Sequence, residues 1–175
     1  MSQYTYEHEN KGTALETYEW DNVWWEQPSR NDVPRVLYIG DSISCATRRI
    51  ATSYSGDKIL FDGFGTSKAL DNPFLFDSIR MFAKQQKHRD AILFNNGLHG
   101  WHLDDDKYEE LYLKLVENIK KCSPDTPIFI VLTTAVDDAR EFSQRVPKRN
   151  DRAIDGAKKE DAGIIVLYFL STANK

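Results

Sequence analysis

A serine stands at a glycine break that directly follows an apolar run. Residues 36–39 are apolar and rich in β-branched side chains, Gly40 permits a tight turn, and Asp41, Ser42 and Ser44 follow. In open α/β sheets, ligands bind just outside the carboxyl ends of the strands, so a hydroxyl group delivered there is well placed for nucleophilic chemistry. The sequence therefore predicts Ser42 as a candidate nucleophile. The alternative is a turn that only caps the next helix.

Two more polar loops follow apolar runs further along the chain. One is the stretch 62–67, with sequence Asp-Gly-Phe-Gly-Thr-Ser, and the other is the stretch 95–99, with sequence Asn-Asn-Gly-Leu-His. We expect the topology to bring both to the same edge of a sheet as Ser42. The backbone N–H of Gly65 and the amides of Asn95 or Asn96 would then act as donors to a carbonyl oxygen that gains negative charge in acyl transfer.

Other polar side chains near this edge have two interpretations each. Thr133 and Thr134 follow the fourth apolar run and are candidates for lining a pocket. His99 is a candidate general base or a packed loop residue. The histidines at 99 and 102, with three acidic residues at 104–106, also suggest a metal site. We expect no metal and no cofactor, because acidic residues at the start of a helix are explained by its macrodipole.

The elements that must position these residues alternate along the chain. Because the apolar runs lack polar alternation, they predict parallel strands buried on both faces. The expected fold is a three-layer α/β/α sandwich, flavodoxin-like and doubly wound, with a five-stranded parallel sheet. The expected strands lie at 36–39, 58–61, 90–94, 127–132 and 163–168, and the expected helices lie at 44–53, from 72 onward, at 104–121 and, with weak amphipathicity, within 136–159.

Length and composition limit the organisation and the partners. A chain of 175 residues is one domain, divided here into a polar N-terminal arm at 1–19 and a domain at 20–175. Trp20, Trp24 and Trp25 are expected in an arm laid over the core, with sugar stacking as the alternative. The net charge of −4 gives no sign of a basic surface that would bind nucleic acid. No apolar run is long enough to span a membrane. The start of the chain lacks a signal-peptide pattern, which predicts a cytoplasmic protein, or a secreted or periplasmic one if a leader was removed.

With these blocks, the chain resembles the SGNH/GDSL hydrolase superfamily of esterases and acylhydrolases. It is most similar to the branch with a tryptophan-rich lead-in and an Asn-Asn-Gly-Leu-His block, which often acts on carbohydrate esters. The match of residues 40–44 to the first block implies that Ser42 is the nucleophile. Residues 65–67 resemble the second block, with Lys68 in place of a usual glycine, which implies the Gly65 N–H as an oxyanion donor. Residues 95–97 stand in place of the third block, and we assign its side-chain donor to Asn96 rather than Asn95.

The fourth block of the family, an Asp-x-x-His motif, has no counterpart. None of His8, His88, His99 and His102 has an aspartate three positions earlier. The sequence thus resembles a family member truncated at its C-terminus before the general base and the last helix.

Two expectations follow from this missing block. The first is weak or absent hydrolysis of a small-molecule ester or an acylated carbohydrate, because loss of triad members costs about 10⁴–10⁶ in turnover. The second is self-association through the sheet face that the last helix would cover. The alternative function is a catalytically inactive ligand-binding remnant of the same fold. A phosphate binder is disfavoured, because the loop at 40–44 lacks the extra glycines and the lysine of phosphate cradles.

Overall fold

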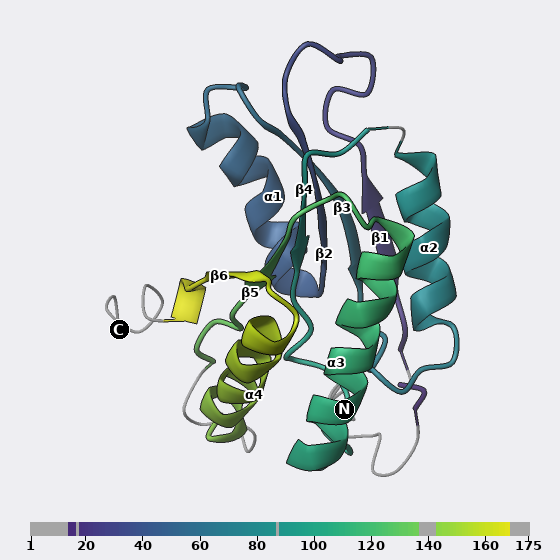
Figure 1. Cartoon of the computed structure of the whole chain (residues 1–175), viewed down its shortest axis with the longest axis vertical. Coiled ribbons are helices and arrows are strands. Elements are labelled where there is room, and N and C mark those ends of the chain that lie inside the picture. Colours follow the sequence, from purple (N-terminus) through teal and green to yellow (C-terminus); the bar gives the residue numbers. More distant parts are fainter. Residues whose placement is uncertain (1–13, 17, 87, 137–142, 169–175) are drawn as a thin grey trace, which may run out of the picture.

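A six-stranded sheet is the centre of the molecule (Figure 1). The structure, a computed structural model, describes residues 14–16, 18–86, 88–136 and 143–168. The strands are β1 (Asp21–Trp24), β2 (Arg35–Gly40), β3 (Leu60–Thr66), β4 (Ala91–Phe94), β5 (Ile128–Val131) and β6 (Gly163–Ile165).

The five strands β2 to β6 run parallel, in the spatial order β3-β2-β4-β5-β6. In a flavodoxin-like sheet the second strand of the chain lies outside the first, and the later strands extend the opposite side in order. The predicted flavodoxin-like parallel sheet is therefore confirmed, and it places the carboxyl ends of β2, β3, β4 and β5 along one edge.

The sixth strand corrects the sequence-based prediction. Residues Asp21–Trp24 form β1, which pairs antiparallel with β3 at the edge of the sheet. The prediction of an arm laid over the core is wrong for this segment. Its four residues are two polar ones followed by two apolar ones, and without alternation periodicity does not distinguish this strand from a loop.

Strand β3 also extends through the stretch 62–66, which the sequence analysis assigned to a polar loop. Gly63 and Gly65 lie inside the strand because helix α1 (Ser42–Tyr54) packs closely against it. A Cβ atom at Gly63 would lie 2.5 Å from the Arg48 Cδ atom, and one at Gly65 would lie 2.2 Å from the Cys45 Sγ atom. These glycines therefore provide room for the helix rather than flexibility.

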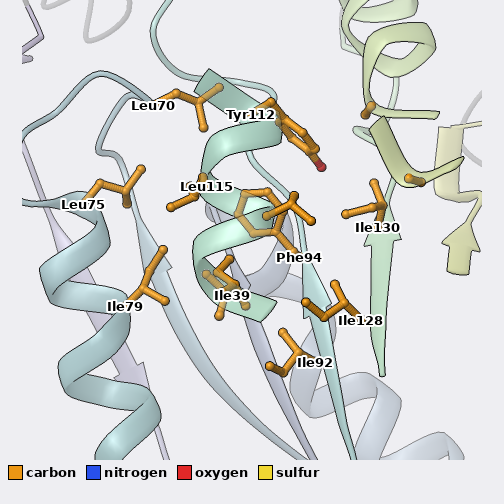
Figure 2. Close-up of a cluster of buried hydrophobic side chains, with 14 of the residues drawn as sticks. Ile39, Leu70, Leu75, Ile79, Ile92, Phe94, Tyr112, Leu115, Ile128 and Ile130 are labelled. Carbon is orange, nitrogen blue, oxygen red and sulfur yellow. The ribbon is translucent and has the colours of Figure 1, made fainter. Parts of the chain in front are cut away.

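Helices cover the two faces of the sheet unequally. Helix α1 packs on β2 and β3, and Tyr38 faces it beside Thr47. Neighbouring residues of a strand point to opposite faces, and Leu37 and Ile39 lie in the main hydrophobic core with residues of α2 (Leu75–Gln85), α3 (Asp105–Cys122) and α4 (Arg145–Lys159). Figure 2 shows this core between the sheet and the helices. The predicted three-layer sandwich is confirmed.

Helix α4 buries a stripe that hydrophobicity alone does not reveal. Its buried positions follow helical spacing, but several are polar or small: Val146, Arg149, Asn150, Ala153, Gly156 and Ala157. The helix therefore has one clearly buried face, although its charged sequence predicted only weak amphipathicity.

On the face that α1 shares, the described helices leave β4, β5 and β6 uncovered. Leu93, Phe129 and Ile165 project to this face, by register with Tyr38 and by alternation along the strands, and each is only half-buried. Ile164 and Val166, in and after the edge strand β6, are exposed. An apolar region therefore spans the described part of these three strands.

Across the described segments, no helix combines the length and the apolar character needed to cross a membrane. Both cysteines, Cys45 and Cys122, are free thiols.

Candidate active site

Ser42 is the first residue of α1, directly after the carboxyl end of β2, and its side chain is exposed. The helix begins two residues earlier than the predicted start at residue 44, because Asp41 is its N-cap. The Asp41 carboxylate accepts a hydrogen bond of 2.9 Å from the Ile43 N–H. The first turn of a helix presents free N–H groups and a positive dipole end, which favour negative charge near Ser42.

The Asp41 carboxylate also holds the loop that follows β4. It is fully buried, and its Oδ2 atom accepts hydrogen bonds from the N–H groups of Gly97 and Leu98, each at 3.4 Å. One carboxylate thus connects the segment that carries Ser42 with the stretch 95–99. The structure brings together these two loops, as the sequence predicted for the sheet edge.

Asn95 and Asn96 are both buried, but their amides bind different strands. The Asn95 Nδ2 atom donates to the Val131 carbonyl oxygen at 2.8 Å and to the Thr133 Oγ1 atom at 3.1 Å. The Asn96 Nδ2 atom donates to the Lys68 carbonyl oxygen at 3.1 Å, after β3. An amide nitrogen carries two hydrogens, so one donor of Asn96 remains for another acceptor.

Gly65 lies against the first turn of α1. The position of its absent Cβ is 3.4 Å from the Ser44 Oγ atom and 3.5 Å from the Asp41 carbonyl oxygen. Its backbone lies between β1 and β2, in register with Asn22 and Gly40. Gly65 is therefore adjacent to the Ser42 segment, and its role as an oxyanion donor stays a prediction.

The end of β3 is fixed by β1. The buried Lys68 side chain forms an ion pair with Asp21, with both oxygens at 2.7 Å, and the Thr66 hydroxyl donates to the same carboxylate at 2.6 Å. Just before β1, the Trp20 N–H donates to the Ser67 Oγ atom, and the Ser67 N–H donates to the Trp20 carbonyl oxygen. The short antiparallel strand thus holds the residues that face Asn96.

Thr133 is buried and fully engaged at the end of β5, whereas Thr134 is half-buried. Asn150 on α4 accepts from the Thr133 N–H and donates to the Thr133 carbonyl oxygen, both at 2.9 Å. Gly97 packs so closely on Thr133 that a Cβ atom would lie 1.7 Å from the Oγ1 atom. Thr133 therefore supports the loop after β4, and pocket lining by either threonine stays a prediction.

Arg149 is a residue that the sequence analysis did not identify. It is 1% exposed, and its guanidinium donates to the carbonyl oxygens of Gly97, His99 and Gly100 at 2.7–3.1 Å. The rings of Trp101 and Tyr108 lie 3.9 Å and 4.4 Å from its Cζ atom. Burial lowers its pKa to about 10, so it remains charged at neutral pH. A polar residue within a charged helix gives no local signal of such burial.

The loop after β4 is thus held on both sides. Its N–H groups at 97 and 98 face the Asp41 carboxylate, and its carbonyl groups at 97, 99 and 100 face the Arg149 guanidinium. Opposite charges on opposite sides of one short segment align its peptide groups. The conformation of the stretch 95–99 is therefore fixed before any ligand binds.

The two histidines near this loop have separate carboxylate partners. The His99 Nδ1 atom lies 3.0 Å and 3.2 Å from the two Glu16 oxygens, and the His102 Nε2 atom lies 2.8 Å from Asp71. Asp104, by contrast, caps α3 through the Lys107 N–H. Within the described residues, no group of three or more such side chains is arranged to hold a metal ion.

The three tryptophans lie in different surroundings. Trp20 packs edge-on against His99, with ring centroids 6.2 Å apart. Trp24 lies in β1 under the guanidinium of Arg49, and Trp25 lines a hollow of about 430 Å³. That hollow also includes Arg35 at the amino end of β2, opposite the Ser42 edge. Of the three, Trp20 is the one that contacts the loop after β4.

Comparisons with known proteins agree with this fold. Similar solved structures include the acetyl xylan esterase AlAXEase (17% identity, TM-score 0.59), covering 79% of this chain and 80% of that one. A lipolytic protein of the G-D-S-L family from Veillonella parvula DSM 2008 (18%, 0.61) covers 81% and 82%, and the SGNH-hydrolase family esterase AlinE4 (15%, 0.56) covers 82% and 80%. No family model and no curated protein matches the sequence. The chain has the SGNH hydrolase fold, as the resemblance in its sequence implied.

Proposed function

We propose that this protein is a serine ester hydrolase in which Ser42 is the nucleophile. The observation that carries the proposal is the position of Ser42: an exposed hydroxyl at the first turn of α1, joined through Asp41 to the loop after β4. Nucleophilic hydroxyls of α/β enzymes occupy this kind of place, beyond the carboxyl end of a central strand. The shared fold with esterases and acylhydrolases supports the same reaction class.

In the proposed reaction, the Ser42 oxygen bonds to the acyl carbon and the carbonyl electron pair moves to oxygen. The N–H groups of Ser42 and Gly65 and the remaining amide hydrogen of Asn96 stabilise that oxyanion. Collapse of the tetrahedral intermediate releases the alcohol and leaves an acyl-serine, which water then hydrolyses. Asn95, Thr133 and Thr134 flank this group as pocket residues.

The proposed substrate is a small ester or an acylated carbohydrate. One neighbour of the same fold is an acetyl xylan esterase, and Trp20, beside His99, offers an aromatic surface of the kind that packs on sugars. We propose turnover slower than that of an enzyme with the complete Asp-x-x-His motif, because these 175 residues contain no such motif and a base must come from elsewhere among them.

Hydrolysis of 4-nitrophenyl acetate by the parent and by Ser42→Ala tests the proposal. We expect the parent to hydrolyse the ester above the rate in buffer and Ser42→Ala to lose that excess, because Ser42 carries the acyl group in the proposed reaction. Ser53→Ala is the matched control, since Ser53 is also exposed and lies at the other end of the same helix. A fluorophosphonate probe should modify Ser42 in the parent, as read by mass spectrometry of the labelled peptide.

Equal rates for the parent and Ser42→Ala, together with no labelling of Ser42, would contradict the proposal. Binding of an acetylated xylo-oligosaccharide without turnover, measured by titration calorimetry, would instead identify the inactive ligand-binding remnant.

A further inference from the structure

A buried pair of a carboxylate and an imidazole lies at the same edge of the sheet as Ser42. The His99 and Glu16 side chains are 10% and 8% exposed, and both Glu16 oxygens lie within hydrogen-bond distance of the His99 Nδ1 atom. Glu16 is 83 residues away in sequence. Burying a carboxylate and an imidazole usually lowers the stability of a protein, because both groups lose their hydration. The burial of this pair therefore suggests a role other than stabilising the fold.

Several contacts fix the imidazole in place. Trp20 packs edge-on against the ring, and the His99 carbonyl oxygen accepts a hydrogen bond of 2.7 Å from Arg149. Glu16 is itself positioned, because its N–H donates to the Glu19 carboxylate, which also accepts from the Asn72 amide at 2.8 Å. Both members of the pair are therefore held from several elements of the fold.

Asp41 connects the backbone segments that carry His99 and Ser42. Its carboxylate accepts from the Ile43 N–H on one side and from the Leu98 N–H on the other. Ser42 lies between Asp41 and Ile43, and His99 directly follows Leu98. Ser42 and His99 are therefore each adjacent in sequence to a residue whose N–H binds the buried Asp41 carboxylate.

The chemistry of the pair matches that of a catalytic base with its orienting acid. When Nδ1 donates its hydrogen to a carboxylate, the neutral imidazole carries its lone pair on Nε2, the tautomer that can take a proton from a serine. The other described histidines lack this combination. His88 is largely exposed and precedes β4, at the opposite edge, and His102 contacts Asp71 through Nε2, so a proton there leaves only Nδ1.

We propose that His99 is the general base that activates Ser42, with Glu16 as its positioning residue; this inference rests on the proposed esterase function. The Ser42 proton moves to the His99 Nε2 atom as the serine oxygen bonds to the acyl carbon. The imidazolium then gives that proton to the alcohol oxygen as the carbon–oxygen bond of the ester breaks. In the second half, His99 takes a proton from the attacking water and returns it to the Ser42 oxygen when the acid leaves.

Chemical rescue tests this inference in the full chain. We expect His99→Ala to lower the Ser42-dependent rate on 4-nitrophenyl acetate by about 10²–10⁴-fold, the usual contribution of a general base. Added imidazole should restore part of the rate in His99→Ala, and none in the double variant that also carries Ser42→Ala. A merely structural histidine would not respond to free imidazole.

Two more variants separate positioning from basicity. His99→Asn retains a donor near the Nδ1 position but has no base, so we expect a folded protein with the low rate of His99→Ala. Glu16→Gln should lower kcat more than it changes KM, because the histidine remains but its tautomer is no longer fixed. His102→Ala is the matched control, a second histidine paired with a carboxylate near the same loop, and it should keep the parent's rate.

The outcomes distinguish the two proposals. A Ser42-dependent rate that persists in His99→Ala would overturn the inference and leave the esterase function standing. A rate lost in His99→Ala, with an unchanged unfolding transition and no rescue by imidazole, would also overturn it. A parent that shows no Ser42-dependent rate would overturn both.

Discussion

At the scale of single residues, the Asp41 carboxylate connects three parts of the candidate site. It caps α1, it accepts from the two N–H groups after β4, and it borders Ser42 in sequence. The sequence motif presents this aspartate as the neighbour of a nucleophile. Its buried hydrogen bonds also hold the loop that carries Ser42 against the loop after β4. Its structural role therefore affects the geometry of the candidate site.

Replacing Asp41 by asparagine should therefore affect stability and activity together. Asn retains one acceptor oxygen, so we expect the cap to weaken, the bonds to Gly97 and Leu98 to be lost, and the free energy of unfolding to fall by about 1–2 kcal/mol. The Ser42-dependent rate should fall as well. Urea unfolding and ester hydrolysis measure the two effects, with Asp106→Asn as an exposed control on α3. Unchanged stability in Asp41→Asn would argue against the proposed role.

At the scale of elements, α4 is the helix that shapes the site without contributing a predicted site residue. Arg149 binds three carbonyl groups of the loop after β4, and Asn150 binds both backbone groups of Thr133. The helix therefore fixes the conformation of two strand ends at once. The charged sequence of α4 gives little sign of this role, because the buried stripe contains a single valine beside arginine, asparagine, alanine and glycine.

Arg149→Met should be among the more destabilising single substitutions. It removes the Arg149 hydrogen bonds to three buried carbonyl groups, of which the Gly100 carbonyl keeps a donor in the Leu103 N–H. We therefore expect a loss of about 3 kcal/mol or more in the free energy of unfolding. Arg152→Met on the same helix is the control. Its ion pairs with Asp106 and Glu109 are partly exposed, so its cost should stay below about 1 kcal/mol. Urea unfolding of both variants provides the comparison, and equal losses would argue against the role assigned to Arg149.

At the scale of the whole molecule, three helices cover one face of the sheet and a single described helix, α1, covers part of the other. Helix α1 covers β2 and β3, while Leu93, Phe129 and Ile165 remain half-buried on the same face of the described strands. Such a continuous apolar region favours association, because pairing removes it from water.

We predict that two copies of this chain associate through that face. Sedimentation velocity over a range of concentrations should reveal a dimer, and Phe129→Gln should shift the equilibrium toward the monomer. Met81→Gln removes an exposed apolar side chain from α2, on the other face, and should leave the equilibrium unchanged. A concentration-independent monomer for the parent protein would contradict this prediction.

The sequence by itself determined the alternation of strands and helices and the place of Ser42 at a strand end. Those features are local. Four adjacent apolar residues followed by a glycine predict β2, and apolar residues at helical spacing over five turns predict α3. The confirmed flavodoxin-like sheet follows from them because right-handed crossovers leave few topologies.

Only the tertiary structure decided how the site is held together. The pairing of His99 with Glu16, of Asp41 with the loop after β4, and of Arg149 with the same loop each joins residues more than 45 positions apart. Likewise, β1 is a strand because β3 offers it an edge, and Gly65 is strand rather than loop because Cys45 packs on it. No local pattern encodes these contacts, since their energy depends on burial and on partners that only folding brings together.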